Sequence, residues 1–146
     1  MSHWVYNGQV IEEIPEGVEG FVYRITNNIS GRKYIGRKYF YRTKRKPIKN
    51  STRRRVVTKS SDWKTYTGSN KNLSSDIKLL GMDNFTFEIL AFGYTRGQVN
   101  FIEENVQHRL GVLTDSGYYN DSIGSRKYIG VKIDDAFLGV LRNIQL

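Results

Sequence analysis

Apolar residues fall on every second position in two segments of the chain, which is the spacing of a β-strand with one buried face. The segments are 20–26 and 85–90. Turn-forming residues at 27–31 directly follow the first strand, so 33–40 is predicted to return beside it as the second strand of a hairpin.

Two further segments repeat their apolar residues at helical spacing. The first helix is predicted to begin after a capping residue, Ser69 or Asn70, and to end at Gly81. The second covers 98–110, and the tail beyond it is predicted to hold one more short strand and an amphipathic end over 135–141. The order of elements indicates an α/β fold of the α+β type, a small three-stranded antiparallel sheet flanked by helices.

Basic residues are concentrated in one part of the chain. No acidic residue occurs in 20–61, which contains more than half of the 23 lysines and arginines. Within it, 44–59 is polar, basic and interrupted by Pro47, which predicts a loop or mobile insertion kept extended by charge repulsion. The residues predicted to bind nucleic acid are Arg37, Lys44, Arg45, Lys46, Lys49, Arg53, Arg54, Arg55, Lys59 and Lys64.

Composition narrows the class of protein further. A chain of 146 residues suffices for one compact domain, and its net charge of +9 indicates a polyanionic partner. The absence of cysteine excludes disulfides, thiolate zinc sites and cysteine nucleophiles. No stretch is long and apolar enough to cross a bilayer, so we expect a soluble cytoplasmic protein with no membrane partner.

Paired aromatic motifs connect these segments to a known family. The tripeptide FVY at 21–23 precedes YIG at 34–36, and these are followed by DWKTYTGS at 62–69 and, after the second helix, YN at 119–120. In this order the motifs resemble the GIY-YIG nuclease family, especially its phage-encoded free-standing members, although the first motif keeps only its tyrosine. The resemblance covers 20–124.

The resemblance implies a division of the chain. A GIY-YIG-like nuclease domain would occupy 20–124 and carry a basic insertion at 42–61. Residues 1–19 would form an N-terminal extension, and residues 125–146 a C-terminal extension packed on the same domain.

The resemblance also implies a metal-dependent endonuclease that hydrolyses phosphodiester bonds of double-stranded DNA, one strand per active site. Tyr23 and Tyr34 would position and deprotonate the attacking water and contact the phosphate, and one carboxylate would hold Mg²⁺ or Mn²⁺. The alternative is that both are half-buried strand aromatics. Strand geometry allows the catalytic interpretation, because Tyr34 and Lys38 point to one side and Tyr23 on the paired strand can lie beside them.

The cation that contacts the phosphate is harder to assign. The family carries an arginine on a helix shortly after the second motif, and here the basic insertion replaces that stretch. Lys38 is the first candidate and Arg42 the second, and Arg53 to Arg55 remain open. Any of them can instead make a nonspecific backbone contact.

Two adjacent glutamates compete for the metal. Glu103 and Glu104 face directions about a hundred degrees apart on a helix, so only one points at the hairpin. Glu103 lies four residues after the apolar Val99 and is preferred, whereas Glu104 can pair with His108 on the surface. Asn120 matches the family's late asparagine, which supports the site by hydrogen bonds; the alternative is a simple turn residue.

One short repeat complicates the assignment of the second motif. The segment 126–132 (RKYIGVK) nearly repeats 32–38 (RKYIGRK). The first copy follows a strand with a suitably spaced tyrosine, so it is assigned the chemistry. The second copy is interpreted as a decoy or a DNA-backbone contact.

Other functions remain open at this stage. The main alternative is a non-catalytic DNA- or RNA-binding module that uses the basic insertion, followed by a ribosome-associated protein and a structural phage protein. If the enzyme interpretation holds, we expect a phage-encoded monomer or weak homodimer in the bacterial host. A dimer on DNA would be needed for concerted double-strand breaks.

Overall fold

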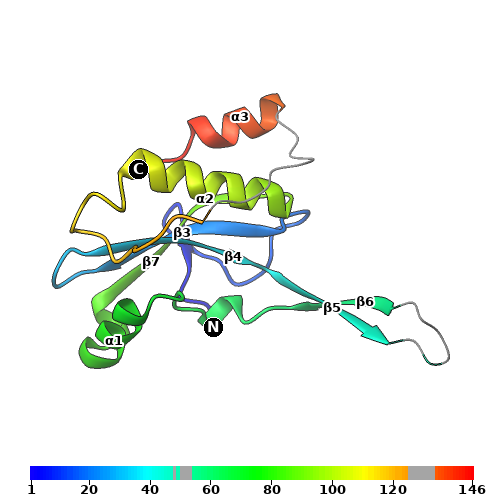
Figure 1. The fold of residues 1–146 in the computed structure, drawn as a ribbon, viewed down its shortest axis with the longest axis horizontal. Helices are drawn as coiled ribbons and strands as arrows, with labels where there is room; N and C mark the ends of the chain where they lie inside the picture. Colours follow the sequence, from blue (N-terminus) through cyan, green and yellow to red (C-terminus); the bar gives the residue numbers. More distant parts are fainter. Residues whose placement is uncertain (48, 50–53, 125–133) are drawn as a thin grey trace.

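The computed structural model describes residues 1–47, 49, 54–124 and 134–146. Five strands form one sheet in the order β2-β1-β7-β3-β4 (Figure 1). They are β1 (Val5–Tyr6), β2 (Gln9–Val10), β3 (Gly20–Asn27), β4 (Lys33–Tyr39) and β7 (Phe85–Gly93). Strand β3 is antiparallel to both β4 and β7, and β1 joins β7 in parallel, which leaves β4 as an edge strand.

The mixed α and β class is as predicted, but the prediction of a three-stranded sheet is wrong. The N-terminal residues add β1 and β2, which are joined by Asn7 and Gly8, both with positive φ. An Asn-Gly pair is a strong hairpin signal that sequence analysis overlooked, because strands of two residues have too few positions to show alternation. Trp4, before β1, is fully buried and its indole Nε1 donates to the carbonyl of Trp63 at 2.6 Å.

The basic insertion is a hairpin, and its prediction as a loop is wrong. Strands β5 (Tyr41–Pro47) and β6 (Arg54–Ser60) form a separate two-stranded sheet that projects from the body (Figure 1). Alternation was not detectable because the side chains of both faces are mainly charged or polar. The register places Arg42 opposite Lys59, a pair of like charges that an anion would relieve.

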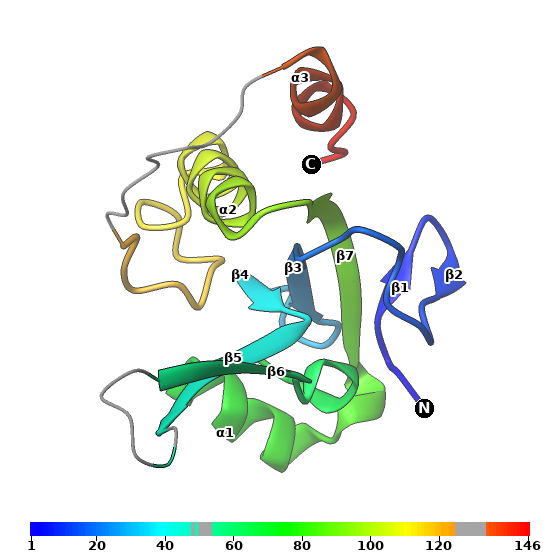
Figure 2. The same ribbon diagram turned by 90° about the vertical axis from the view of Figure 1, so that its right-hand side faces the viewer.

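Helices cover both faces of the main sheet, with α1 on one side and α2 and α3 on the other (Figure 2). Helix α1 (Lys71–Leu80) is capped by Asn70, which accepts from Leu73 N at 3.0 Å. Helix α2 (Arg96–Leu110) begins two residues earlier than predicted, with Thr95 as its cap. Single turns η1 (Trp63–Thr65) and η2 (Met82–Asn84) flank α1.

The amphipathic end predicted for the tail is the helix α3 (Asp135–Arg142), capped by Asp134. The further strand predicted in the tail and the repeat at 126–132 cannot be placed, since 125–133 lie outside the described residues.

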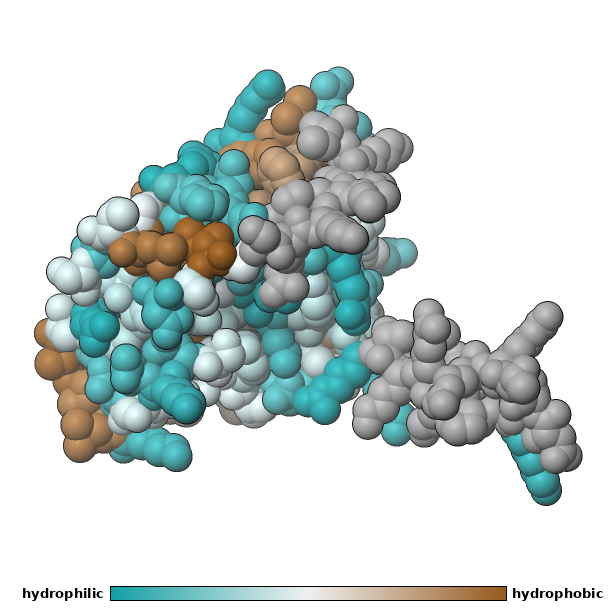
Figure 3. Space-filling model, in the orientation of Figure 1, coloured by the Kyte–Doolittle hydropathy of each residue, from teal (hydrophilic) through white to brown (hydrophobic). Residues whose placement is uncertain are grey.

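The alternation along β3 divides the core in two. One buried cluster contains Phe21, Tyr23 and Ile25 with residues of α1, and the other contains Val22 with residues of α2. The face shown in Figure 3 is mainly hydrophilic. None of the helices in the described part of the chain is long and apolar enough to cross a membrane.

Candidate active site

A polar pocket of about 230 Å³ lies at the edge of β4. β4 is the edge strand of the sheet, and in the described part of the chain its outer side is bridged only locally, by Tyr118 beside Lys33 and by Asn120 beside Ile35. Residues from both faces of the sheet therefore reach this pocket. Phenol groups come from the α1 face, and a carboxylate, an amide and a guanidinium come from the α2 face. The residues that line the pocket include Tyr23, Tyr34, Tyr66, Arg37, Glu103, Gln107 and Asn120.

Gly36 allows Tyr23 to reach the edge of the sheet. The two residues are paired across β3 and β4, and a Cβ atom at position 36 would lie 2.6 Å from Tyr23 Cζ and 2.9 Å from Tyr34 Cε2. The Tyr23 ring therefore lies directly over the bare Cα of Gly36. The Tyr23 and Tyr34 ring centroids are 6.2 Å apart, as the predicted strand geometry requires.

Both tyrosines are protonated at neutral pH. Burial raises the pKa of Tyr23 well above its ordinary value of 10.0, and the neighbouring phenols of Tyr66 and Tyr34 raise it further. Burial also raises the pKa of Tyr34, although its hydrogen bond with Ser69 acts in the opposite direction. In this state each hydroxyl can donate a hydrogen bond to an oxygen atom in the pocket.

The raised pKa of Tyr23 predicts a loss of stability at alkaline pH. The folded-state pKa of the Tyr23 phenol lies above the unfolded value of 10.0. Its contribution to the free energy of unfolding is therefore complete below pH 10 and is lost as pH rises above it. Above pH 10 the free energy of unfolding of the wild type should fall faster than that of Tyr23→Phe, by up to about 1.4 kcal/mol per pH unit. Urea unfolding from pH 8 to 11 measures both; parallel profiles would contradict the assignment.

Glu103 is the glutamate that faces the tyrosines. It is 8% exposed, lines the pocket, and its Oε1 lies 3.6 Å from Arg37 Nη1. Glu104 is not among the pocket residues. No cluster of three or more His, Cys, Asp or Glu occurs in the described ranges, and the pocket is lined by two carboxylates, those of Glu103 and Asp121. Few carboxylates among several hydroxyl and amide oxygens suit a hydrated Mg²⁺.

Arg37 is the cation closest to Glu103. Burial alone lowers the pKa of its guanidinium, but hydrogen bonding with Tyr39 and the charge of Glu103 raise the pKa overall, so the group stays charged. Sequence analysis named Arg37 only as a DNA contact, because alternation placed it on the face opposite Tyr34. Because β4 is an edge strand, side chains on both of its faces can reach the same pocket, and Arg37 and Tyr34 both line it.

Asn120 holds the exposed edge of β4. Its Oδ1 accepts from Ile35 N at 3.0 Å, and its Nδ2 donates to Ile35 O at 2.8 Å. The asparagine therefore takes the place of a neighbouring strand for one residue of β4. This geometry matches the expected supporting role by hydrogen bonds.

Replacing Asn120 by alanine should destabilise the fold. The backbone N–H of the buried Ile35 would lose its side-chain acceptor, and the Ile35 carbonyl would keep only Gln107 Nε2 as a side-chain donor. Leaving the N–H unpaired costs about 1–3 kcal/mol. Urea unfolding of Asn120→Ala measures the cost, with Asn105→Ala on the α2 surface as the control. Equal stability of the two variants would show that the hydrogen bonds between Asn120 and Ile35 do not stabilise the fold.

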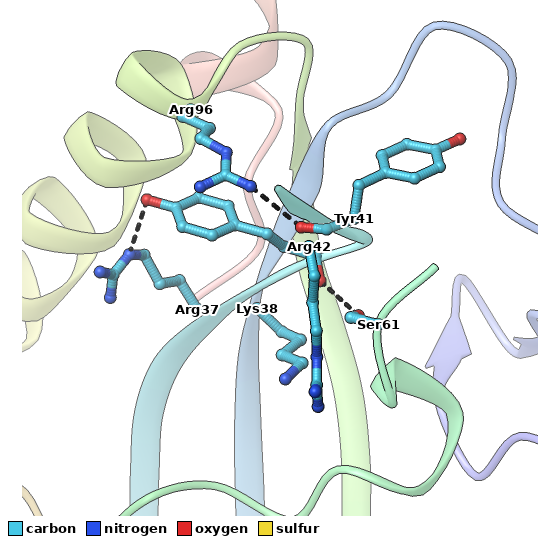
Figure 4. A pocket seen from close by; sticks show the side chains of 7 residues that line it. Arg37, Lys38, Tyr41, Arg42, Ser61 and Arg96 are labelled. Atoms are coloured by element: carbon cyan, nitrogen blue, oxygen red, sulfur yellow. Dashed lines mark hydrogen bonds between the residues drawn. The ribbon is translucent and has the colours of Figure 1, made fainter. Parts of the chain in front are cut away.

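Lys38 and Arg42 lie outside this pocket and line a neighbouring cavity of about 450 Å³ (Figure 4). Lys38 Nζ donates to Asp62 Oδ1 at 2.7 Å, and Arg42 Nη2 lies 3.3 Å from the same oxygen. The hydrogen bond from Lys38 lowers the pKa of Asp62. Arg37 lines both cavities and extends away from the other two toward α2.

The predicted nucleic-acid contacts spread over several elements. Arg37 belongs to β4, and Lys49, Lys59 and Lys64 are exposed. Arg53 lies outside the described residues. The others belong to the two strands of the basic hairpin: Lys44, Arg45, Lys46, Arg54 and Arg55.

Sequence analysis did not assign six of the pocket residues to the site: Tyr66, Ser69, Gln107, Asp121, Ser122 and Gly124. Gln107 follows Glu103 by one helical turn and therefore shares its face, a spacing that was available in the sequence. Tyr66 occurs in the DWKTYTGS motif, and its ring lies 6.1 Å from that of Tyr23. No periodic pattern marked Tyr66, because the segment between β6 and α1 is irregular.

Comparison with known proteins identifies the class of this domain. The family model "putative endonuclease segE, GIY-YIG domain" matches residues 4–123, a span that includes the whole pocket up to Ser122. No curated protein and no solved structure gave a significant match.

The chain therefore belongs to the GIY-YIG family of endonucleases. The resemblance inferred from the motifs is confirmed. The match also takes in residues 4–19, which supply β1 and β2 and which the motif resemblance did not reach.

Proposed function

We propose that this chain is a divalent-metal-dependent DNA endonuclease that cuts one strand of a duplex at each active site. The observation that carries the proposal is the convergence of Tyr23, Tyr34, Glu103 and Arg37 in one polar pocket at the edge of β4. Family membership supports the same activity.

Each pocket residue has a role that its chemistry supports. Glu103 would hold Mg²⁺ or Mn²⁺, which when bound polarises the phosphate and lowers the pKa of a coordinated water. The Tyr23 and Tyr34 hydroxyls would orient the attacking water and a phosphate oxygen. Arg37 would stabilise the negative charge that develops on the phosphate, as a guanidinium can bind two of its oxygens.

The neighbouring cavity supports a DNA-backbone contact beside the proposed active site. Arg37, Lys38, Arg42 and Arg96 all line it, and the three carboxylates paired with them neutralise part of their charge: Glu103, Asp62 and Glu19. The basic hairpin begins at the same place, with Tyr41 as its first residue. A duplex whose scissile phosphate lies near Glu103 would place flanking phosphates over this cavity.

Replacing Arg42 by alanine should reduce duplex binding and its salt dependence. Arg42 is 59% exposed at the side chain, so its loss removes one phosphate contact without opening the core. The slope of log K against log salt should become shallower by about 0.9. Fluorescence anisotropy at several salt concentrations measures the slope, and Lys78→Ala, an exposed change on α1, should leave it closer to wild type.

A plasmid assay tests the function itself. With Mg²⁺ or Mn²⁺ the wild type should convert supercoiled DNA to nicked circles before linear DNA accumulates, because one site cuts one strand. Duplex binding without nicking under any divalent metal would instead support a non-catalytic DNA-binding module. Linear DNA appearing without a nicked intermediate would indicate a dimer acting on both strands.

A further inference from the structure

The amide oxygen of Gln107, a residue that lines the pocket, is a buried acceptor without a hydrogen-bond partner in the described part of the chain. The residue as a whole is 5% exposed. Buried polar atoms in folded proteins nearly always have a partner. A buried acceptor on a residue that lines a polar pocket therefore indicates a ligand that carries positive charge or a hydrogen atom to donate.

The orientation of this amide is set by its nitrogen. Gln107 Nε2 donates to the carbonyl of Ile35 at 3.1 Å, and Asn120 Nδ2 donates to the same carbonyl at 2.8 Å. Reversing the amide would bring its oxygen against the Ile35 carbonyl oxygen, which is unfavourable. Oε1 is therefore held on the other branch of the amide, away from the Ile35 carbonyl oxygen.

Gln107 lies on the same face of α2 as Glu103. The two residues are four positions apart, which is close to one helical turn, and both line the pocket. A carboxylate and an amide oxygen are thus presented from one rigid element. Oxygen atoms arranged in this way suit a hard cation that keeps part of its water shell.

We propose that Gln107 is a positioning residue of the metal site, whose Oε1 accepts a hydrogen bond from water coordinated to the cation at Glu103. The inference rests on the proposed function and adds a second protein oxygen to its metal site. Outer-shell partners of this kind orient the inner ligands, and their loss weakens metal binding by about 10- to 100-fold.

Mn²⁺ binding to the full chain, measured by electron paramagnetic resonance without DNA, tests the inference. Gln107→Met keeps the size of the side chain and removes the oxygen, so the Kd should rise by about tenfold or more. Gln98→Met is the matched control, because Gln98 is a 7% exposed glutamine on the same helix whose Oε1 accepts from Tyr94 N at 3.0 Å, outside the pocket. Its Kd should equal that of the wild type.

A second variant separates metal positioning from a purely structural role. Gln107→Glu adds a negative charge at the same place, so Mn²⁺ should bind more tightly than to the wild type. A glutamine that acts only through its Nε2 donation to Ile35 would lose that hydrogen bond in both variants, so Mn²⁺ would then bind Gln107→Glu no more tightly than the wild type. This variant decides the question if the methionine variant does not fold.

The outcomes for the two proposals are distinct. Wild-type Kd values for both Gln107 variants, with Mn²⁺ binding lost in Glu103→Gln, would overturn the role of Gln107 alone. Binding that is unchanged in Glu103→Gln would overturn the proposed metal site and this inference with it.

Discussion

Replacing Glu103 by glutamine is expected to lower the rate of divalent-ion-dependent DNA cleavage by about a thousandfold, with duplex binding retained. The change keeps the size of the side chain and removes the charge that would hold the ion. A bound metal contributes several kcal/mol of transition-state stabilisation, and each 1.36 kcal/mol corresponds to about a tenfold change in rate. Single-turnover nicking of plasmid DNA measures the loss.

The neighbouring glutamate provides the control for this experiment. Glu104→Gln makes the same chemical change one residue further along α2, at a position outside the pocket. It should cut DNA at close to the wild-type rate. A large loss in Glu104→Gln together with full activity in Glu103→Gln would reverse the assignment of the two glutamates.

Replacing Gly36 by alanine is expected to cost both activity and stability. The added methyl group would lie 2.6 Å from Tyr23 Cζ, and the buried ring can move only by disturbing its neighbours. Overpacking of this kind costs about 1–3 kcal/mol. Displacing a catalytic group by about 1 Å can lower the rate about a hundredfold. Urea unfolding and plasmid nicking measure the two effects.

Gly139→Ala is the matched control for this substitution. Gly139 lies within α3, and a Cβ atom there would meet nothing within 4 Å. Because alanine favours helices over glycine by about 1 kcal/mol, this variant should be at least as stable as the wild type and equally active. Wild-type activity in Gly36→Ala would show that the position of the Tyr23 ring over β4 is not needed for cleavage.

Much of the central fold could be predicted because its elements have one buried face. Phe21, Tyr23 and Ile25 alternate on β3, and the apolar residues of α1 recur at helical spacing between Asn70 and Gly81. Periodicity detects such elements since the core selects apolar residues at regular positions.

Strands without regularly spaced apolar residues facing the core were not predicted from the sequence. Strands β1 and β2 are only two residues long, and their place beside β7 depends on the burial of Trp4. The strands of the basic hairpin form their own two-stranded sheet, separate from the main one. Their charged side chains therefore gave no apolar pattern.

The site was predictable where one strand face or one helix face decided the geometry. Strand alternation brought Tyr23 and Tyr34 together, and helical geometry favoured Glu103 over Glu104; the structure places the three preferred residues in one pocket. The position of Arg37 was not predictable, because it follows from β4 being the edge strand. Which strand lies at the edge depends on the pairing of the whole sheet, so the local sequence of β4 does not indicate it.

The most direct test of the central claim is the position of Mn²⁺ in crystals of Tyr34→Phe bound to duplex DNA. If Tyr23, Tyr34 and Glu103 act on one phosphate, the anomalous signal of the ion will lie between the Glu103 carboxylate and a DNA phosphate in the pocket at the edge of β4. An ion bound elsewhere, or DNA whose phosphates all lie far from Glu103, would contradict the account.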